Sequence, residues 1–104
     1  MAINGDLARN DPALSRVARN VIWFEEPGEA LQNEERFLAY LMTYGNLEDL
    51  LTAFNYFSDE SFMAALRNAP PGIFDIRSWT FWNLHYFRAV PPLPVRRLPD
   101  LRIS

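Results

Sequence analysis

Apolar residues recur at helical spacing along most of the chain, in short runs separated by residues that break helices. Spacings of three and four residues mark one face of an α-helix, and no strand-like alternation stands out beside them. The pattern predicts four helices followed by an aromatic one, over residues 11–24, 33–44, 46–57, 58–69 and from 76 or 78 to 87.

The start of each run carries a helix-capping residue. Asp11 precedes Pro12, and this pair is a good helix start because the aspartate caps free backbone N–H groups while proline fits the first helical position. Asn46 predicts the start of the third helix in the same way. Either Ser58 or Asp59 is expected to cap the fourth helix.

The ends of the runs are marked as well. Trp23 and Phe24 close the first helix, and residues 25–28 are expected to break the chain there. Gly45 fits the left-handed residue that ends many helices, so it is expected to end the second one. The inner side of that second helix is predicted to carry Phe37, Leu38, Leu41 and Tyr44.

The third helix has the clearest pattern of all. Glu48 and Asp49 fall in its first turn, where negative charge complements the helix dipole. Its apolar stripe follows the i, i+3, i+4, i+7 spacing closely. The stripe contains Leu47, Leu50, Leu51, Phe54 and Phe57.

Residues 74–87 form an unusually aromatic segment that also holds the only histidine, His85. On a helix, Phe81 and Leu84 lie on one face. The other apolar face carries Trp79, Trp82, Tyr86 and Phe87. Since an amphipathic helix of a small domain needs only one apolar stripe, the second face is expected to pack inside the domain or against a partner.

Together these signals predict an all-α fold: a compact bundle of four to five short helices, helix-turn-helix-like, with an extended proline-rich C-terminal tail. We expect a flexible N-terminus over residues 1–10, a helical domain over 11–89 and a proline- and arginine-rich tail over 90–104. At 104 residues the chain fits one domain with one modest core.

Composition narrows the functional classes. The chain has no cysteine, which removes disulfides, thiolate metal sites and cysteine nucleophiles together. No segment approaches the roughly 20 apolar residues of a membrane span, and the N-terminus lacks the apolar stretch of a signal peptide. A cytoplasmic protein is therefore expected. The net charge of −3 gives no overall attraction to nucleic acid.

Catalytic chemistry is hard to build from these residues. There is no nucleophile elbow, phosphate-binding loop or dinucleotide fingerprint, so no enzyme activity and no cofactor are predicted. No metal site is predicted either, because His85 has no second histidine to act with it. We expect His85 to be a partly buried helix residue bonded to the backbone. The acidic pairs are best explained as helix-start residues.

A protein partner fits the aromatic segment better, because tryptophan, tyrosine and arginine carry much of the binding energy of interfaces. The predicted partner-binding residues are Trp23, Trp79, Trp82, Tyr86 and Arg88. A homodimer is compatible with the same surface. The alternative for these aromatics is the core of the domain itself, and this applies above all to Phe81 and Trp82.

DNA binding is the second functional hypothesis, in the form of a helix-turn-helix-type transcriptional regulator. The side chains available for base and phosphate contacts are Arg77, Asn83 and Arg88 on the aromatic helix and Arg96 and Arg97 on the tail. The first three make a sparse recognition helix, so this hypothesis ranks below protein binding.

The order of motifs resembles a family of small bacterial all-helical proteins of unknown function. The resemblance rests on VIWFEE (21–26), on the stretch from Arg36 to Ala69 with its tyrosine–glycine and LEDL elements, and on SWTFWNLHYF (78–87). Members are often encoded beside nucleotidyltransferase-type toxins of the AbiEii kind. The resemblance therefore implies an antitoxin-like partner of a bacterial toxin–antitoxin pair, and it brings no catalytic residues with it. The proline-rich tail and the Pro70–Gly72 linker depart from the family pattern.

Overall fold

A computed structural model describes residues 11–94 of the chain, and within that range the fold is all-helical. Six helices occur there, against the four or five predicted from the sequence, and no strand is present among these residues. They are α2 (Pro12–Val21), α3 (Pro27–Ala30), α4 (Glu34–Tyr44), α5 (Leu47–Phe54), α6 (Asp59–Arg67) and α7 (Ile76–Phe87).

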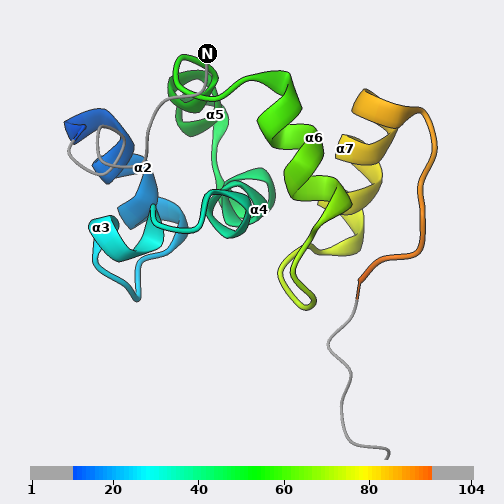
Figure 1. Cartoon of the computed structure of the whole chain (residues 1–104), viewed down its shortest axis with the longest axis horizontal. Helices are drawn as coiled ribbons and strands as arrows, with labels where there is room; N and C mark the ends of the chain where they lie inside the picture. Colours follow the sequence, from blue (N-terminus) through cyan, green and yellow to red (C-terminus); the bar gives the residue numbers. More distant parts are fainter. Residues whose placement is uncertain (1–10, 95–104) are drawn as a thin grey trace, which may run out of the picture.

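Helix α4 lies at the centre of the bundle. It contacts α2 on one side and α6 and α7 on the other, while α5 packs on both α2 and α4 (Figure 1). The small helix α3 lies against α2, at the opposite end of the bundle from α7. Because α4 meets neighbours on several sides, it buries most of its apolar residues: Phe37, Leu38, Ala39, Leu41 and Met42.

Side-chain caps fix where most helices begin. Asp11 Oδ1 accepts hydrogen bonds from the backbone N–H groups of Ala13 and Leu14, at 2.8 and 3.2 Å. Asn46 and Ser58 cap α5 and α6 in the same manner. The helix starts predicted at Asp11 and Asn46 are therefore confirmed, and of the two candidates for the fourth helix Ser58 is the cap.

Gly45 ends α4 for a different reason from the one predicted. Its φ of −69° is not left-handed, so the left-handed expectation was wrong. A Cβ at this position would lie 2.6 Å from the carbonyl oxygen of Leu41, which only a glycine avoids. Among the residues that follow the described helices, Arg88, directly after α7, is left-handed, with φ 57°.

The predicted break at residues 25–28 contains a helical turn. Helix α2 ends at Val21, and Trp23 and Phe24 follow in a bend before Pro27 starts the four-residue helix α3. Proline is well suited to a first helical position, so the residue expected to break the chain also starts α3.

The aromatic helix α7 closes the core with its inner face. The Trp82 indole Nε1 donates a buried hydrogen bond to the carbonyl oxygen of Met42, at 2.9 Å. This carbonyl belongs to the last turn of α4, where no helical N–H is available to it. The Trp82 ring thus fills the core, and its N–H also donates a hydrogen bond to a carbonyl at the end of α4.

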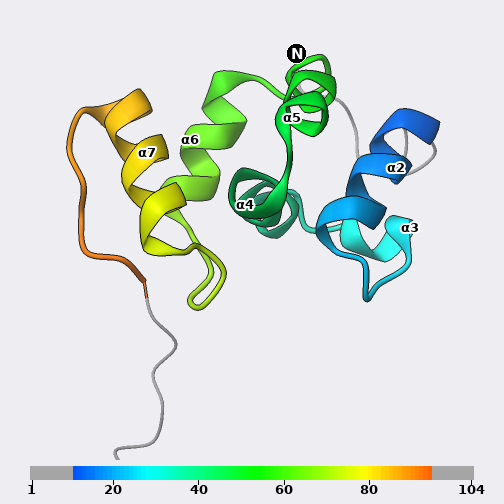
Figure 2. The same cartoon turned by 180° about the vertical axis from the view of Figure 1, so that it is seen from behind.

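After α7 the chain runs back along the outer side of α7 without helix or strand as far as Pro94 (Figure 2). The Trp79 indole Nε1 donates to the carbonyl oxygen of Pro91 at 2.7 Å, which holds this segment against α7. The remainder of the expected tail and the N-terminal segment expected to be flexible, residues 95–104 and 1–10, lie outside the described residues.

Candidate functional site

Helix α5 turns its large apolar side chains toward solvent. Leu47 is 71% exposed, Leu51 56% and Phe54 43%. The buried residues of the same helix are Asp49 and Ala53. We call the three exposed side chains, Leu47, Leu51 and Phe54, the α5 stripe. An amphipathic surface helix normally has the opposite orientation, with its apolar face on the core.

Hydrogen bonds from Asp49 account for this orientation. Asp49 Oδ2 accepts from the backbone N–H of Asn46 at 3.2 Å, while the Asp49 N–H donates to Asn46 Oδ1 at 2.8 Å. The other carboxylate oxygen of Asp49 accepts from Asn20 Nδ2 on α2, at 3.1 Å. Ala53, one turn further along, is small enough for α2 to pack closely. The inward face of α5 thus carries a polar anchor and a small residue, next to the half-buried Leu50, while Leu47 and Leu51 stay outside.

A groove lies beside the stripe, between α5 and α7. Leu50 borders it from α5 and Phe81 from α7, and Met42 and Trp82 also line it; its volume is about 440 Å³. The rings of Phe81 and Trp82 meet edge to face, with their centroids 5.1 Å apart. The groove is of mixed character, because the polar residues Thr43, Asp75, Arg77 and Ser78 line it as well.

The aromatic helix α7 has the two faces that its sequence predicts, one inside and one outside. Trp79 and Trp82, both predicted as partner contacts, are buried at 2% and 6% exposure and leave a partner little surface. Phe81 and Leu84, on the other face, are 60% and 50% exposed. The outer face of α7 is thus the one that remains available.

The remaining predicted contacts are Tyr86, near the end of α7, and Arg88, directly after it. Tyr86 is half-buried and its hydroxyl donates to Asp59 Oδ1 at 3.0 Å. Burial and that hydrogen bond raise the pKa of Tyr86, so the ring stays neutral. Arg88 is exposed. Asp59 is the first residue of α6, so the Tyr86 hydrogen bond joins the C-terminal end of α7 to the N-terminal end of α6.

Trp23 is the most exposed of the predicted aromatic contacts, at 79%. It packs edge to face on Phe24, whose ring meets Tyr40, and Tyr40 stacks on Tyr44. Tyr44 was expected on the inner side of its helix but is exposed, because it joins this aromatic row rather than the core. The row borders a hollow of about 490 Å³.

An ion pair anchors the same region of the surface. Arg36 donates two hydrogen bonds to the Glu25 carboxylate, at 2.9 and 2.7 Å, and its guanidinium lies over the Tyr40 ring. This contact lowers the pKa of Glu25 and raises that of Arg36. Glu25 thus fixes the bend that carries Trp23.

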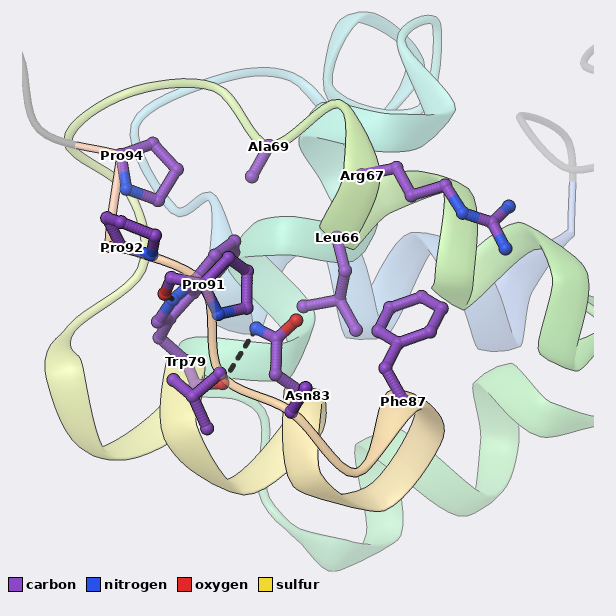
Figure 3. Close-up of a pocket in the computed structure, with 11 residues that line it drawn as sticks. Leu66, Arg67, Ala69, Trp79, Asn83, Phe87, Pro91, Pro92 and Pro94 are labelled. Carbon is purple, nitrogen blue, oxygen red and sulfur yellow. Dashed lines mark hydrogen bonds between the residues drawn. The ribbon is translucent and has the colours of Figure 1, made fainter.

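A third hollow, of about 580 Å³, lies under the proline-rich segment and is mainly apolar (Figure 3). Leu66 and Phe87 line it together with Trp79. Asn83, at its wall, is buried and its side-chain Nδ2 donates to the carbonyl oxygen of Trp79 at 2.9 Å. The hollow is bordered by three prolines, Pro91, Pro92 and Pro94.

The three residues named for DNA contact that lie within residues 11–94 do not form one surface. Asn83 is buried in its bond to Trp79, so it has no surface to offer a base edge. Arg77 is exposed beside the α5–α7 groove and Arg88 is exposed at the other end of α7. Arg96 and Arg97 lie outside the described residues. The helix-turn-helix character stays a prediction.

His85 differs from expectation, since it is exposed rather than partly buried. Its ring is stacked over that of Phe81, with centroids 6.2 Å apart. Across residues 11–94, no three histidine, aspartate or glutamate side chains gather as a metal site requires. None of the helices in this range is long and apolar enough to span a bilayer.

Sequence reasoning overlooked the α5 stripe as a contact surface, although its spacing was recognised. The capping box of Asn46 and Asp49 could be foreseen, but the burial of Asp49 depends on Asn20, which lies 29 residues earlier in the chain. Comparison of the chain with protein-family models, with curated proteins and with solved structures found no match.

Proposed function

We infer that the protein is a non-enzymatic protein–protein interaction module whose recognition surface is the α5 stripe with the adjoining α5–α7 groove. The observation that carries this proposal is the outward orientation of Leu47, Leu51 and Phe54 on a single helix. The largest apolar patch on the surface of a monomeric protein is often a site of interaction, and the stripe is a patch of that kind.

Burial of the stripe supplies part of the free energy that binding requires. Full burial of one leucine or phenylalanine side chain is worth about 1.5–3 kcal/mol. The exposed portions of the three side chains amount to between one and two whole side chains, so covering them contributes roughly 2.5–5 kcal/mol. Contacts with Leu50 and Phe81 at the groove add to this, and a partner of micromolar affinity needs about 8 kcal/mol net.

The resemblance in sequence supports an antitoxin-like role as the specific form of this proposal. In that role the protein covers the active surface of a toxin, and a nucleotidyltransferase-type toxin is the first partner to test. The aromatic row around Trp23 offers a second anchor on the same molecule, since tryptophan is the residue most enriched at binding hot spots.

The test is a binding titration of purified chain against a purified candidate partner, by calorimetry, with two matched variants. Leu51→Glu places a charge at the centre of the stripe, and Leu84→Glu makes the same change at a leucine of similar exposure on α7. We expect Leu51→Glu to weaken binding at least tenfold and Leu84→Glu to leave it within about twofold. Equal losses, or none for Leu51→Glu, would remove the stripe from the interface.

A further inference from the structure

We propose that the hollow beside Trp23 binds a trimethylammonium group, the charged head of choline and of trimethylated lysine. The hollow has a volume of about 490 Å³, and four of the six described residues that line it are aromatic: Trp23, Phe24, Tyr40 and Tyr44. Cages of aromatic rings are the sites at which proteins hold quaternary ammonium ions. This surface is distinct from the α5 stripe, so the inference does not depend on the proposed function.

Neighbouring rings of this aromatic row stand at steep angles to one another. Trp23 and Phe24 meet at 89°, with their centroids 5.5 Å apart, and Phe24 meets Tyr40 at 68° and 5.9 Å. Tyr40 and Tyr44 are closer to parallel, at 29°. The rings therefore turn toward the hollow as walls with different directions rather than as one flat platform. Such walls suit a compact, round group better than a planar one.

Most of the rings keep open surface that a ligand can cover. Trp23 is 79% exposed, Tyr44 62% and Phe24 50%. Val21 also lines the hollow and is buried at 3% exposure, so an aliphatic residue of the core adjoins the rings. The methyl groups of a trimethylammonium ion would remove part of this apolar surface from water, while its charge lies near the ring faces.

The helix ends at the hollow favour a cation. Asn20 and Val21 are the last two residues of α2, and Tyr44 is the last residue of α4; all three line the hollow. The C-terminal end of a helix carries a partial negative charge, and two such ends meet here. The last turn of α4 contains no basic residue. Arg19, in the last turn of α2, is exposed and is not among the lining residues.

A carboxylate lies behind the Asn20 side chain. Asn20 Nδ2 donates to Asp49 Oδ1 at 3.1 Å, and Asp49 is 4% exposed. Within the described part of the chain Asp49 takes part in no ion pair, so no neighbouring cation cancels its charge. The cation that does contact the aromatic row, Arg36 over the Tyr40 ring, is neutralised by two hydrogen bonds to Glu25. The surroundings of the hollow are thus negative on balance.

An NMR titration of the full chain with choline tests the site, followed through the indole N–H signals of its three tryptophans. We expect the Trp23 signal to shift with a dissociation constant of about 1–10 mM, because each cation–π contact at an exposed site is modest. The indole N–H groups of Trp79 and Trp82 are hydrogen-bonded to backbone carbonyls inside the protein, and their signals should stay in place.

Neohexyl alcohol is the matched neutral probe, because it has the shape of choline with carbon in place of the charged nitrogen. We expect it to bind at least about fivefold more weakly than choline, since it lacks the charge that the rings attract. The amide of N-acetyl-trimethyllysine is the second cationic probe. Whichever of this amide and choline binds more tightly identifies the molecule that carries the head group.

Matched variants separate ring faces from apolar bulk. Trp23→Leu removes a ring but keeps an apolar side chain, and it is expected to weaken choline at least about fivefold while changing neohexyl alcohol little. Tyr44→Phe keeps the ring and should bind choline like the parent chain, whereas Tyr44→Leu should bind it more weakly. Phe81→Leu, at an aromatic residue of α7 that is 60% exposed, is the control and should bind like the parent chain. Circular dichroism checks that each variant is folded.

Equal affinity for choline and neohexyl alcohol would show that the hollow accepts apolar groups regardless of charge, and would overturn the proposal. Choline binding that survives Trp23→Leu would overturn it as well, as would a Trp23 signal that does not move up to about 50 mM choline. Leu51→Glu is expected to leave choline binding unchanged. Failure of this site and failure of the α5 stripe are therefore separate results.

Discussion

Asp49 and Leu51 lie two positions apart on α5, and each has the environment expected of the other. The aspartate is 4% exposed and the leucine 56%. The aspartate is buried because it closes the capping box with Asn46 and accepts a hydrogen bond from Asn20 on α2. The leucine faces solvent as a consequence. The exposed stripe, and with it the proposed function, depends on the environments of these two residues.

Asp49→Ala is expected to lower the free energy of unfolding by about 1–2 kcal/mol, because it removes half of the capping box and leaves Asn20 without its acceptor. Urea denaturation measures this. Glu48→Ala, at the neighbouring exposed acid, is the control. Its 3.8 Å pair with Arg16 is exposed, so the expected change is below about 0.5 kcal/mol. Equal effects of the two variants would contradict the anchoring role of Asp49.

Gly45→Ala is expected to destabilise the protein by about 1–3 kcal/mol, since the added Cβ would lie 2.6 Å from the Leu41 carbonyl oxygen and force the end of α4 to shift. Gly28→Ala is the matched control. No atom lies within 4 Å of a Cβ there and the residue is helical, so a gain of up to about 1 kcal/mol is expected. Thermal unfolding of the two variants should therefore shift in opposite directions.

Trp82→Phe removes the hydrogen bond to the Met42 carbonyl and part of a buried ring. A loss of about 2–4 kcal/mol in unfolding free energy is expected from the unpaired carbonyl and the cavity together. Trp23→Phe changes an exposed ring and should alter stability by less than about 0.5 kcal/mol. If Trp23→Phe proved as costly as Trp82→Phe, the division between core and surface aromatics would be wrong.

The Glu25–Arg36 ion pair is expected to make the stability of the protein depend on pH. The hydrogen bonds from Arg36 hold the pKa of Glu25 below its ordinary value of 4.5 in the folded protein. The stability that the Glu25–Arg36 pair contributes is therefore fully present above the ordinary pKa of glutamate. It is lost as the pH falls through the lower pKa that Glu25 has in the folded protein. Melting curves of the parent chain and Glu25→Gln should differ at neutral pH and converge in acid. Glu26→Gln, at an exposed position, should follow the parent chain at every pH.

The sequence predicted the helices well because local signals determine them. Asp11, Asn46 and Ser58 cap helices through contacts within three residues, and such contacts are visible in the order of residues alone. The two faces of α7 were predicted for the same reason. Local spacing fixes which residues share a face of a helix.

Which face points inward depends on other helices, and here the sequence was a poorer guide. Asn20 holds Asp49 across 29 residues, and Trp23, Phe24 and Tyr40 draw Tyr44 out of the core. Neither relationship appears in the periodicity. The predicted contacts therefore included the buried Trp79 and Trp82, while the exposed α5 stripe was not named.

The most direct test of the central claim is the unfolding free energy of Leu51→Glu, measured at a concentration low enough for the chain to be monomeric. With Leu51 facing solvent, the new carboxylate stays hydrated and the change should be within about 0.5–1 kcal/mol of the parent chain. If the stripe instead packed on the core, the charge would be buried without a partner. A loss of more than about 3 kcal/mol would show this and would contradict the account.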